Sequence, residues 1–347
     1  MPGPYDVGRE ELAALLSDQP PYRVRQVWDG LHRQARRPSE MTDLPAPLRE
    51  RLEAALPPAL TECSKRVGDG GDTLKWLFSL FDGARVETVL MAYPDRVTAC
   101  VSTQAGCAMA CTFCATGQAG FTRQLSAGEI VEQVVAATRA ARPRRLSNVV
   151  FMGMGEPLAN YDATLASLRA LCDQLGISAR HLTVSTVGVA PAIERLALDA
   201  PTVTLAVSLH AANDELRDTL VPLNRRYPLA RVEEACARWT AATRRRVSFE
   251  WALIDGVNDA PRDAAELAAI ARRLRAHVNL IALNPTRGFA TSGTPRDGVV
   301  AFRDALRDRG VAVTVRATRG REIDAACGQL AAVSGARRPR RPVASSA

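Results

Sequence analysis

The chain has 347 residues, of which 47% are hydrophobic and eight are cysteines. No apolar run approaches the roughly 18 residues that a membrane-spanning helix needs. The first residues also lack the basic and apolar pattern of a signal peptide, so we expect a cytoplasmic protein without membrane spans. The net charge of +8 favours a polyanionic partner such as nucleic acid, although the arginine-rich basic set also fits a GC-rich genome.

The chain begins with a stretch, residues 9–60, in which apolar positions recur at helical spacing. We expect it to form a small helical domain over residues 1–68, before Gly and Pro residues interrupt the pattern. The three expected helices cover residues 10–16, 23–34 and 46–56.

A β-hairpin is expected next. Residues 73–81 and 85–91 have strand character on either side of Asp82-Gly83, a dipeptide that favours a tight turn. We assign a β-hairpin extension to residues 69–96, and a further strand to residues 97–102.

From about residue 126 onward, helices alternate with strands through short connections. Helices are expected at residues 126–141, 162–175, 190–198, 228–242, 262–276 and 296–309, and strands at residues 147–152, 181–186, 202–209, 246–253, 278–283 and 311–316. This alternation is typical of parallel βα units. With residues 97–102 it gives seven parallel strands, or six if that strand belongs to the hairpin. This number suits a full or a partial α/β barrel, and we predict a partial (β/α)6 barrel over residues 97–334. We expect the Arg-rich tail at residues 335–347 to be disordered.

Three of the eight cysteines, Cys107, Cys111 and Cys114, lie close together with C-x3-C-x2-C spacing. Three thiolates suit a four-iron cluster that leaves one iron open to a ligand, whereas a structural zinc site normally needs a fourth protein ligand. No fourth Cys or His lies nearby in the sequence. We favour the iron–sulfur cluster, with zinc and buried apolar thiols as the alternatives.

Polar residues follow several of the expected strands, at the end of a barrel where active sites are built. They are Gly155 and Glu156 in a Gly-Met-Gly-Glu-Pro turn, Ser185, Ser208, His210 and Asn284. Taken singly, such a serine is usually a helix cap, and such a histidine is usually structural. Their common placement favours a ligand site.

The cysteine spacing, with an aromatic residue at position 113, resembles the signature of radical S-adenosylmethionine (SAM) enzymes. In that superfamily the open iron of a [4Fe-4S] cluster binds SAM, whose reductive cleavage gives a 5′-deoxyadenosyl radical. The order Gly-Glu-Pro, Ser, Ser-Leu-His and Asn-Pro resembles the radical enzymes that methylate adenine in ribosomal RNA. This resemblance implies SAM binding by Gly155, Glu156, Ser185, Ser208, Leu209, His210 and Asn284.

On sequence alone, we expect Cys100 and Cys327 to be inert buried thiols. However, Asp-Ala-Ala-Cys-Gly-Gln-Leu around Cys327 resembles the methyl-carrying motif of the family that methylates C2 of adenine in 23S rRNA and in the tRNA anticodon loop. The resemblance implies a ping-pong transfer with two SAM per turnover. Cys327 becomes S-methylcysteine, Cys100 resolves the RNA adduct through a transient disulfide, and Glu87 accepts a proton. We expect structural roles for Cys63, Cys172 and Cys236.

The helical domain resembles the helix-hairpin-helix-like RNA-binding extension of this family, and Arg23, Arg25 and Arg33 are candidates for phosphate contacts. The expected partners are 23S rRNA, tRNA and an electron donor such as flavodoxin or ferredoxin, and we expect a monomer.

The rival hypotheses are a related resistance enzyme that methylates C8 of adenine, a non-catalytic iron–sulfur RNA-binding protein and a zinc-binding nucleic-acid module. The residues Thr318-Arg319-Gly320 favour the C2 enzymes over the C8 enzymes.

Overall fold

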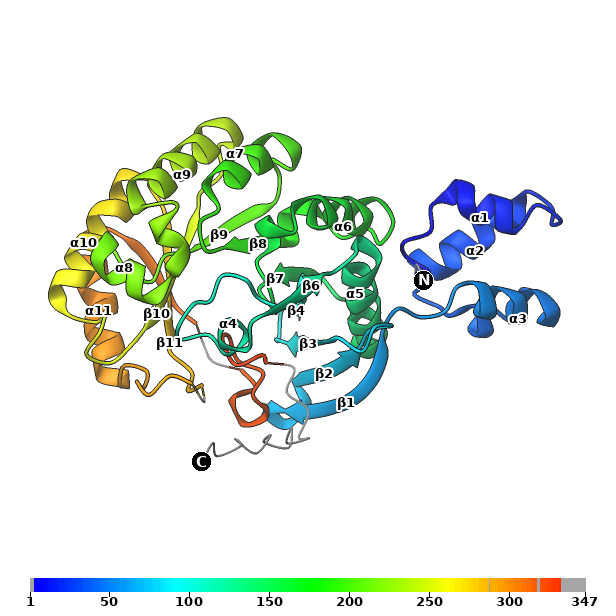
Figure 1. Cartoon of the computed structure of the whole chain (residues 1–347), viewed down its shortest axis with the longest axis horizontal. Helices are drawn as coiled ribbons and strands as arrows, with labels where there is room; N and C mark the ends of the chain where they lie inside the picture. The colour runs from blue at the N-terminus through cyan, green and yellow to red at the C-terminus, as the bar shows by residue number, and fades with distance from the viewer. Residues whose placement is uncertain (1–2, 287, 317–318, 332–347) are drawn as a thin grey trace, which may run out of the picture.

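A curved sheet of ten strands forms the centre of the computed structural model, which describes residues 3–286, 288–316 and 319–331 (Figure 1). Its strands, in spatial order, are β1 (Thr61–Gly68), β2 (Thr73–Ser79), β3 (Arg85–Ala92), β4 (Val97–Cys100), β7 (Asn148–Phe151), β8 (Leu182–Thr186), β9 (Thr204–Ser208), β10 (Ser248–Leu253), β11 (His277–Ala282) and β12 (Ala312–Val315). Neighbouring strands pair antiparallel from β1 to β4 and parallel from β4 to β12.

Helices cover the outer face of the parallel part of the sheet (Figure 1). They are α5 (Ala127–Ala141), α6 (Tyr161–Asp173), α7 (Ala190–Asp199), α9 (Leu229–Thr243), α10 (Pro261–Arg273) and α11 (Arg296–Asp308). Six βα units are thus followed by the strand β12. Because β1 and β12 end the strand order without pairing to each other, the barrel is open, and the predicted partial α/β barrel with six βα units is confirmed.

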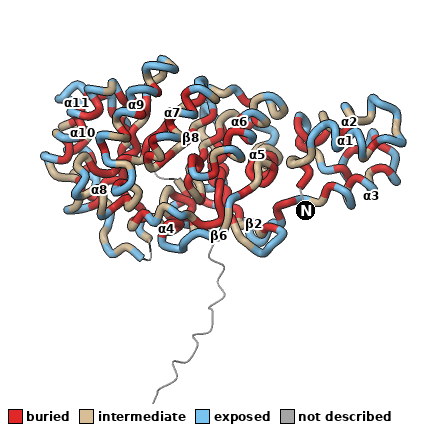
Figure 2. Tube along the Cα trace, turned by 45° about the horizontal axis from the view of Figure 1, so that its top comes forward, coloured by how far each residue is buried: buried red, intermediate tan, exposed pale blue. Residues whose placement is uncertain are grey.

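The parallel strands were predictable because both of their faces are buried, which gives near-continuous apolar runs. Buried residues run through the middle of the barrel and beneath the helices, while exposed residues lie on the outer helix faces (Figure 2). Helix α5 begins with a capping box, in which Ser126 accepts from the backbone N–H of Glu129 and Glu129 accepts from the backbone N–H of Ser126. These local signals explain why the predicted ranges agree with the structure.

The strand β1 was not predicted, and residues 61–68 therefore do not belong to the helical domain. Nearly all of its residues are exposed, so the apolar alternation that marks a half-buried strand is missing. Pairing with β2 holds β1 in place at the edge of the sheet. The hairpin formed by β2 and β3 is confirmed, and it continues the barrel sheet.

Several short elements were also missed by the sequence analysis. They are the two-stranded sheet of β5 (Gln104–Gly106) and β6 (Phe121–Gln124), and the helices α4 (Ala115–Ala119) and α8 (Asp214–Leu220). None exceeds seven residues, which is too short for a hydrophobic period to show. The strand β5 and the helix α4 flank the cysteine loop.

The helical domain has a hydrophobic core of its own, built by α1 (Arg9–Leu15), α2 (Tyr22–His32) and α3 (Ala46–Ala55). It forms a lobe beside α5, the helix that anchors it (Figure 1). The Glu132 carboxylate accepts from the backbone N–H groups of Ala59 and Leu60 at 2.9 and 3.3 Å. Asp6 accepts from the backbone N–H of Gly128 at 2.7 Å, at the first turn of α5.

No helix in the described part of the chain is both long and apolar enough to cross a membrane. The Arg-rich tail, for which we predicted disorder, lies outside the described residues.

A cysteine-lined candidate active site

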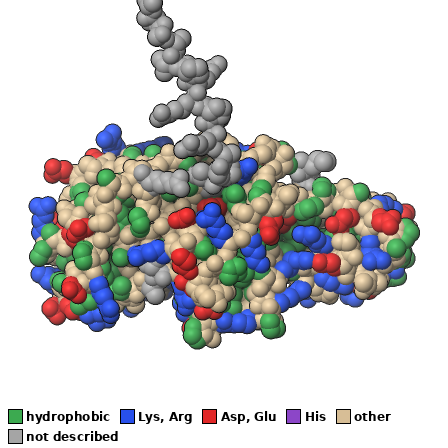
Figure 3. All heavy atoms as spheres, turned by 90° about the horizontal axis from the view of Figure 1, so that it is seen from below, with side chains coloured by type: hydrophobic (Ala, Val, Ile, Leu, Met, Phe, Trp, Pro, Cys, Tyr) green, Lys and Arg blue, Asp and Glu red, His purple; other side chains and the backbone are tan. Residues whose placement is uncertain are grey.

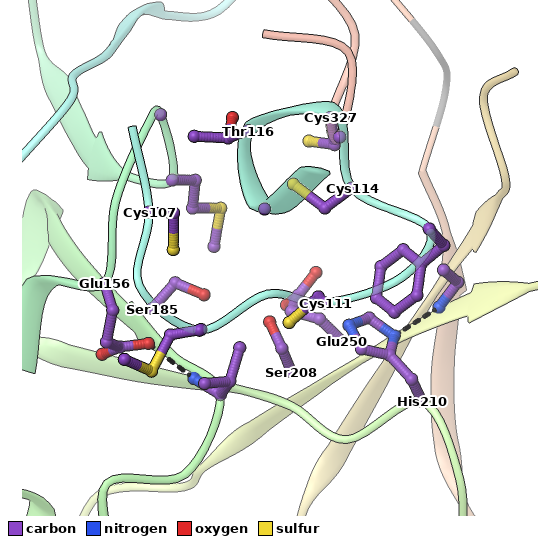
Figure 4. A pocket seen from close by; sticks show the side chains of 18 of the residues that line it. Cys107, Cys111, Cys114, Thr116, Glu156, Ser185, Ser208, His210, Glu250 and Cys327 are labelled. Atoms are coloured by element: carbon purple, nitrogen blue, oxygen red, sulfur yellow. Dashed lines mark hydrogen bonds between the residues drawn. The ribbon is translucent and has the colours of Figure 1, made fainter. Parts of the chain in front are cut away.

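A cavity of about 990 Å³, part of it open to solvent, lies at the carboxyl ends of the parallel strands (Figure 4). Ten residues of this lining were predicted from the sequence: Cys107, Cys111, Cys114, Gly155, Glu156, Ser185, Ser208, His210, Asn284 and Cys327. Loops that are up to 220 residues apart in the chain therefore meet at one end of the barrel, as the strand-end argument required.

The cysteine loop, which carries Cys107, Cys111 and Cys114, runs from β5 to α4. Its conformation at the start depends on a glycine. Gly106 has φ of 77°, and a Cβ atom there would lie 2.0 Å from the carbonyl oxygen of Gly120. Cys107, Cys111 and Cys114 all face the cavity (Figure 4). Burial raises the pKa of the Cys107 thiol to about 12 and that of Cys111 well above its usual value, so thiolates here need a bound cation.

The donor set fits an iron–sulfur cluster better than zinc. Within the described ranges, no three His, Cys, Asp or Glu side chains stand close enough to hold one metal ion. A four-iron cluster instead spreads three thiolates over three different irons and leaves the fourth iron open. The apolar side chains of Met109 and Phe113 flank these thiols and limit the access of water.

The turn after β7 brings backbone close to the cluster loop. Gly155 has φ of 98°, and a Cβ atom at this position would lie 2.5 Å from Cβ of Gln104. The Gln104 side chain accepts from the backbone N–H of Glu156 at 2.9 Å. A side chain at position 155 is therefore excluded both by the backbone conformation and by the neighbouring chain.

Glu156 is almost completely buried and already accepts two backbone hydrogen bonds. They come from Leu158 and Val187, each at 2.9 Å, so the carboxylate joins the turn after β7 to the turn after β8. Burial raises its pKa to about 7, against the lowering effect of these hydrogen bonds. The carboxylate faces the cavity, where its remaining lone pairs can accept from an amino group (Figure 4).

The strand ends β8 and β9 add two hydroxyls and an imidazole. Ser185 and Ser208 line the cavity directly. His210 has φ of 60°, and its Nδ1 accepts from the backbone N–H of Ala252 at 3.0 Å. Burial, with the charge of Arg217, lowers the pKa of His210 to about 3, so the neutral ring carries its proton on Nε2.

The structure does not bring the Leu209 side chain to the cavity. That side chain is fully buried in the barrel core, while its neighbours on both sides face the ligand space. Its carbonyl accepts from Nε of Arg217 at 3.1 Å. Arg217, which the sequence analysis did not single out, also donates to the carbonyl of Val187 at 2.6 Å and so joins the ends of β8 and β9.

Asn284 lies where the cavity of about 990 Å³, the cofactor cavity, meets a second, smaller cavity. Its Nδ2 donates to the carbonyl of Cys327 at 3.1 Å. Its buried Oδ1 has no partner within the described residues, and an orphaned acceptor facing a cavity is suited to a ligand donor. The residues present therefore fit both the cluster and SAM.

The second cavity contains both of the remaining candidate cysteines. Cys100, at the end of β4, and Cys327 line it together with Arg316 and Arg319. All eight cysteines are free thiols in this structure. Burial raises the pKa of Cys100 to about 12, the nearby Cys327 raises it further, and Arg316 opposes both effects.

The loop that carries Cys327 is held from two sides. On the cluster side, the backbone N–H of Ala115 donates to the carbonyl of Gly328 at 2.8 Å. On the hairpin side, the Lys75 ammonium donates to the carbonyl of Asp324 at 3.0 Å. These contacts set the position of Cys327 between the two cavities.

Glu87 lies in β3 and is buried, which differs from the exposed position that a strand carboxylate usually has. It pairs with Lys75 at 3.0 Å and accepts from the backbone N–H of Ala331 at 3.0 Å. It does not line either cysteine cavity. It instead lines a separate groove of about 1360 Å³, beside the loop that carries Cys327.

The arginines predicted to contact phosphate lie on the helical domain. Arg23 and Arg25 line a groove of about 670 Å³ with the exposed ring of Tyr22, whereas Arg33 pairs with Asp29 at 3.6 Å. Basic side chains occur on both the helical lobe and the barrel on the face shown in Figure 3, with acidic side chains among them.

Comparisons with known proteins agree with this geometry. The model of the Radical SAM superfamily matches residues 101–268. Proteins named probable dual-specificity RNA methyltransferase RlmN, from Parafrankia sp. (strain EAN1pec) and Thermobifida fusca (strain YX), are 55% and 53% identical to the chain. These matches cover 94% and 93% of this chain and 91% and 92% of those proteins. The crystal structure of a radical SAM methyltransferase from Sphaerobacter thermophilus matches with a TM-score of 0.92 at 50% identity, over 95% of this chain and 99% of that one.

The open barrel and its cysteine-lined cavity define the protein as a radical SAM enzyme. Because the matches to the RlmN proteins are 55% and 53% identical and cover most of both chains, the chain belongs to the RlmN family.

Proposed function

We propose that this RNA-methylating enzyme transfers a methyl group to C2 of an adenine in 23S rRNA and of an adenine in the tRNA anticodon loop, with Cys327 as the methyl carrier. The observation that carries the proposal is the position of Cys327. It lines the cofactor cavity and, with Cys100, the second cavity. One sulfur can thus face a cofactor on one side and a resolving thiol on the other.

Cys107, Cys111 and Cys114 would hold a [4Fe-4S] cluster, which with bound SAM supplies a 5′-deoxyadenosyl radical. Glu156, Gly155 and Asn284 would fix the methionine part of SAM through hydrogen bonds, as their placement around the cavity suggests. Ser185, Ser208 and His210 would bind the rest of the cofactor.

The chain's own residues perform the transfer. Cys327 first takes a methyl group from one SAM, and a hydrogen atom is then removed from its thiomethyl group at the expense of a second SAM. The carbon radical adds to C2 of adenine, which links protein to RNA. Glu87, which pairs with Lys75, accepts the C2 proton. Cys100 then attacks the sulfur of Cys327 and breaks the bond between that sulfur and the methylene carbon. The carbon takes up a proton to become the methyl group, one electron leaves to the redox partner, and the resulting disulfide is reduced after product release.

The helical domain would hold the RNA through phosphate contacts from Arg23 and Arg25, which fix position without reading sequence. A cytoplasmic location, a monomeric state and reduction by a flavodoxin or ferredoxin complete the proposal.

A Cys100→Ala variant tests the assigned roles. Without the resolving thiol, the covalent RNA–protein adduct should accumulate, and mass spectrometry should find the RNA on Cys327. A Cys172→Ala variant, changed at a cysteine outside both cavities, should turn over without adduct. An RNA-free Cys100→Ala protein under turnover conditions would contradict the proposal, and 8-methyladenosine as the main wild-type product would favour the C8 enzymes.

A further inference from the structure

Arg316 is a cationic side chain in the site that none of the roles above uses. It follows β12, and its backbone N–H donates to the carbonyl of Leu280 at 2.8 Å, which continues the parallel pairing with β11. Its side chain lines both the cofactor cavity and the smaller cavity that holds Cys100 and Cys327. Sequence analysis gave no reason to single it out among the many arginines.

The guanidinium has few partners of its own. Across the described ranges, its one side-chain hydrogen bond goes to Sδ of Met152 at 3.7 Å, and no carboxylate oxygen lies within 4.0 Å of it. The nearby Glu250 carboxylate accepts from Nδ2 of Asn279 at 2.7 Å and from Oγ of Ser248 at 3.0 Å. Most of the five N–H donors of Arg316 are therefore free to meet a ligand.

The charge of this guanidinium is maintained. Its pKa is raised, first by the neighbouring Cys327 and then, against the effect of burial, by Glu250 and Cys100. A charged group in a mostly apolar cavity is costly without an acceptor, so its retention there indicates a partner that arrives with the substrate.

Adenine supplies acceptors at the required place. C2 is flanked by the ring nitrogens N1 and N3, and neither carries a proton. If C2 lies within reach of Cys327, one of these nitrogens must lie beside the groups that surround that sulfur. Arginine, which can only donate, complements such an acceptor.

We propose that Arg316 is a further catalytic residue, which donates a hydrogen bond to the ring nitrogen next to the methylated carbon of adenine. This inference rests on the proposed C2 methylation. When the carbon radical on Cys327 adds to C2, one C–C bond forms, one C–N π bond opens and the unpaired electron passes to the ring. Loss of the C2 proton to Glu87 then leaves negative charge on the ring nitrogens, which the guanidinium stabilises.

The test combines a protein change with a matched change in the RNA. Arg316→Met preserves most of the side-chain volume, and a short RNA substrate carries 1-deazaadenine or 3-deazaadenine at the target position. Two rates are measured on the cluster-containing enzyme: S-methylation of Cys327, by mass spectrometry of the protein, and single-turnover transfer to RNA. Arg303→Met, at a half-exposed arginine on the outer helix α11, is the control for loss of an arginine.

The variant should transfer the methyl group to RNA about 10- to 100-fold more slowly, as expected for loss of a hydrogen bond from a charged donor, and should slow the methylation of Cys327 by a clearly smaller factor. One of the two deaza substrates should slow the wild-type enzyme by a similar factor and slow Arg316→Met by less than about threefold. Arg316→Lys, which keeps a charge and a donor, should recover part of the transfer rate.

Three results would overturn the inference. If the effect of Arg316→Met on the transfer rate multiplies fully with the effect of each deaza substrate, Arg316 contacts neither nitrogen. An equal loss of Cys327 methylation would show that it acts on the thiol. A wild-type enzyme that neither deaza substrate slows would show that neither ring nitrogen accepts a hydrogen bond. By contrast, a wild-type enzyme that forms no methyladenine would remove the proposed function itself, and the inference with it.

Discussion

At the scale of single residues, the site depends on groups whose surroundings change their ordinary chemistry. Glu156 is buried, so that its carboxyl group has a pKa of about 7 instead of a value near 4.5. His210 is kept neutral by burial, and its Nδ1 is occupied by a backbone donor. Both groups can thus form hydrogen bonds to a ligand in the cavity.

The raised pKa of Glu156 predicts a pH-dependent affinity for SAM. An amino group that donates to the carboxylate favours its ionised form, so affinity should be full above about pH 7. As the pH falls below that value the carboxyl must lose a proton on binding, and Kd should rise by up to about tenfold per pH unit. Anaerobic calorimetry of the cluster-containing enzyme from about pH 6 to about pH 8 measures this.

A Glu156→Gln variant is the control, because protonation of the amino group of SAM itself also weakens binding at low pH. The variant should bind SAM more weakly and show a pH slope shallower by up to one unit. Equal slopes for the two proteins would mean that Glu156 is not the titrating group.

Where a residue follows a predicted strand, as Glu156, Ser208 and Asn284 do, its position at the cavity could be predicted from the sequence. It failed for residues whose importance depends on distant neighbours. Arg217 and Arg316 are two arginines among 45 basic residues, and only the folded chain shows that they are directed at the site. Leu209 was assigned to the SAM site by the resemblance to the family, and the structure places its side chain in the core while Ser208 and His210 face the cavity.

At the scale of elements, the hairpin strands hold the loop that carries Cys327. Lys75 in β2 and Glu87 in β3 form a buried ion pair, and each also contacts the loop, at Asp324 and at Ala331. The two contacts lie on opposite sides of Cys327 in sequence. The β-hairpin extension therefore holds the loop that carries Cys327 in position, a role that its sequence alone did not indicate.

Removing one member of this ion pair should weaken the fold and release the loop. Lys75→Met leaves Glu87 buried without its cation, which should lower the free energy of unfolding by about 3 kcal/mol. Urea unfolding of the full chain measures the loss, and alkylation of Cys327 by iodoacetamide should become faster.

The double variant Lys75→Met/Glu87→Gln should recover part of that stability, since no unpaired charge remains. Additive losses in the two single variants and the double variant would show that the two side chains do not act as a pair.

Prediction at this scale followed the strength of the local pattern. The barrel strands and helices were found because their apolar periods are long and continuous. The strand β1 was missed because its exposed side chains carry no alternation, and it depends on hydrogen bonds to β2 that no local pattern encodes. The short helices α4 and α8 lack a full period, so the cysteine loop was recognised by its spacing and not by its structure.

At the scale of the whole molecule, three separate parts of the chain meet at one site. The loop with Cys107, Cys111 and Cys114 follows β5, Cys100 ends β4, and Cys327 lies beyond the last strand, 227 residues after Cys100. The open barrel brings them together because all of them lie at the carboxyl ends of its strands. The central claim is that Cys327 transiently carries the transferred methyl group and loses a hydrogen atom from it.

Turnover with SAM bearing a trideuterated methyl group tests that claim most directly. If the methyl group passes through Cys327 as a carbon radical, the adenine product should carry only two of the three deuterium atoms, and the 5′-deoxyadenosine should contain the third. Mass spectrometry of both products measures this. Transfer of the intact trideuterated methyl group to RNA, with no deuterium in 5′-deoxyadenosine, would contradict the account.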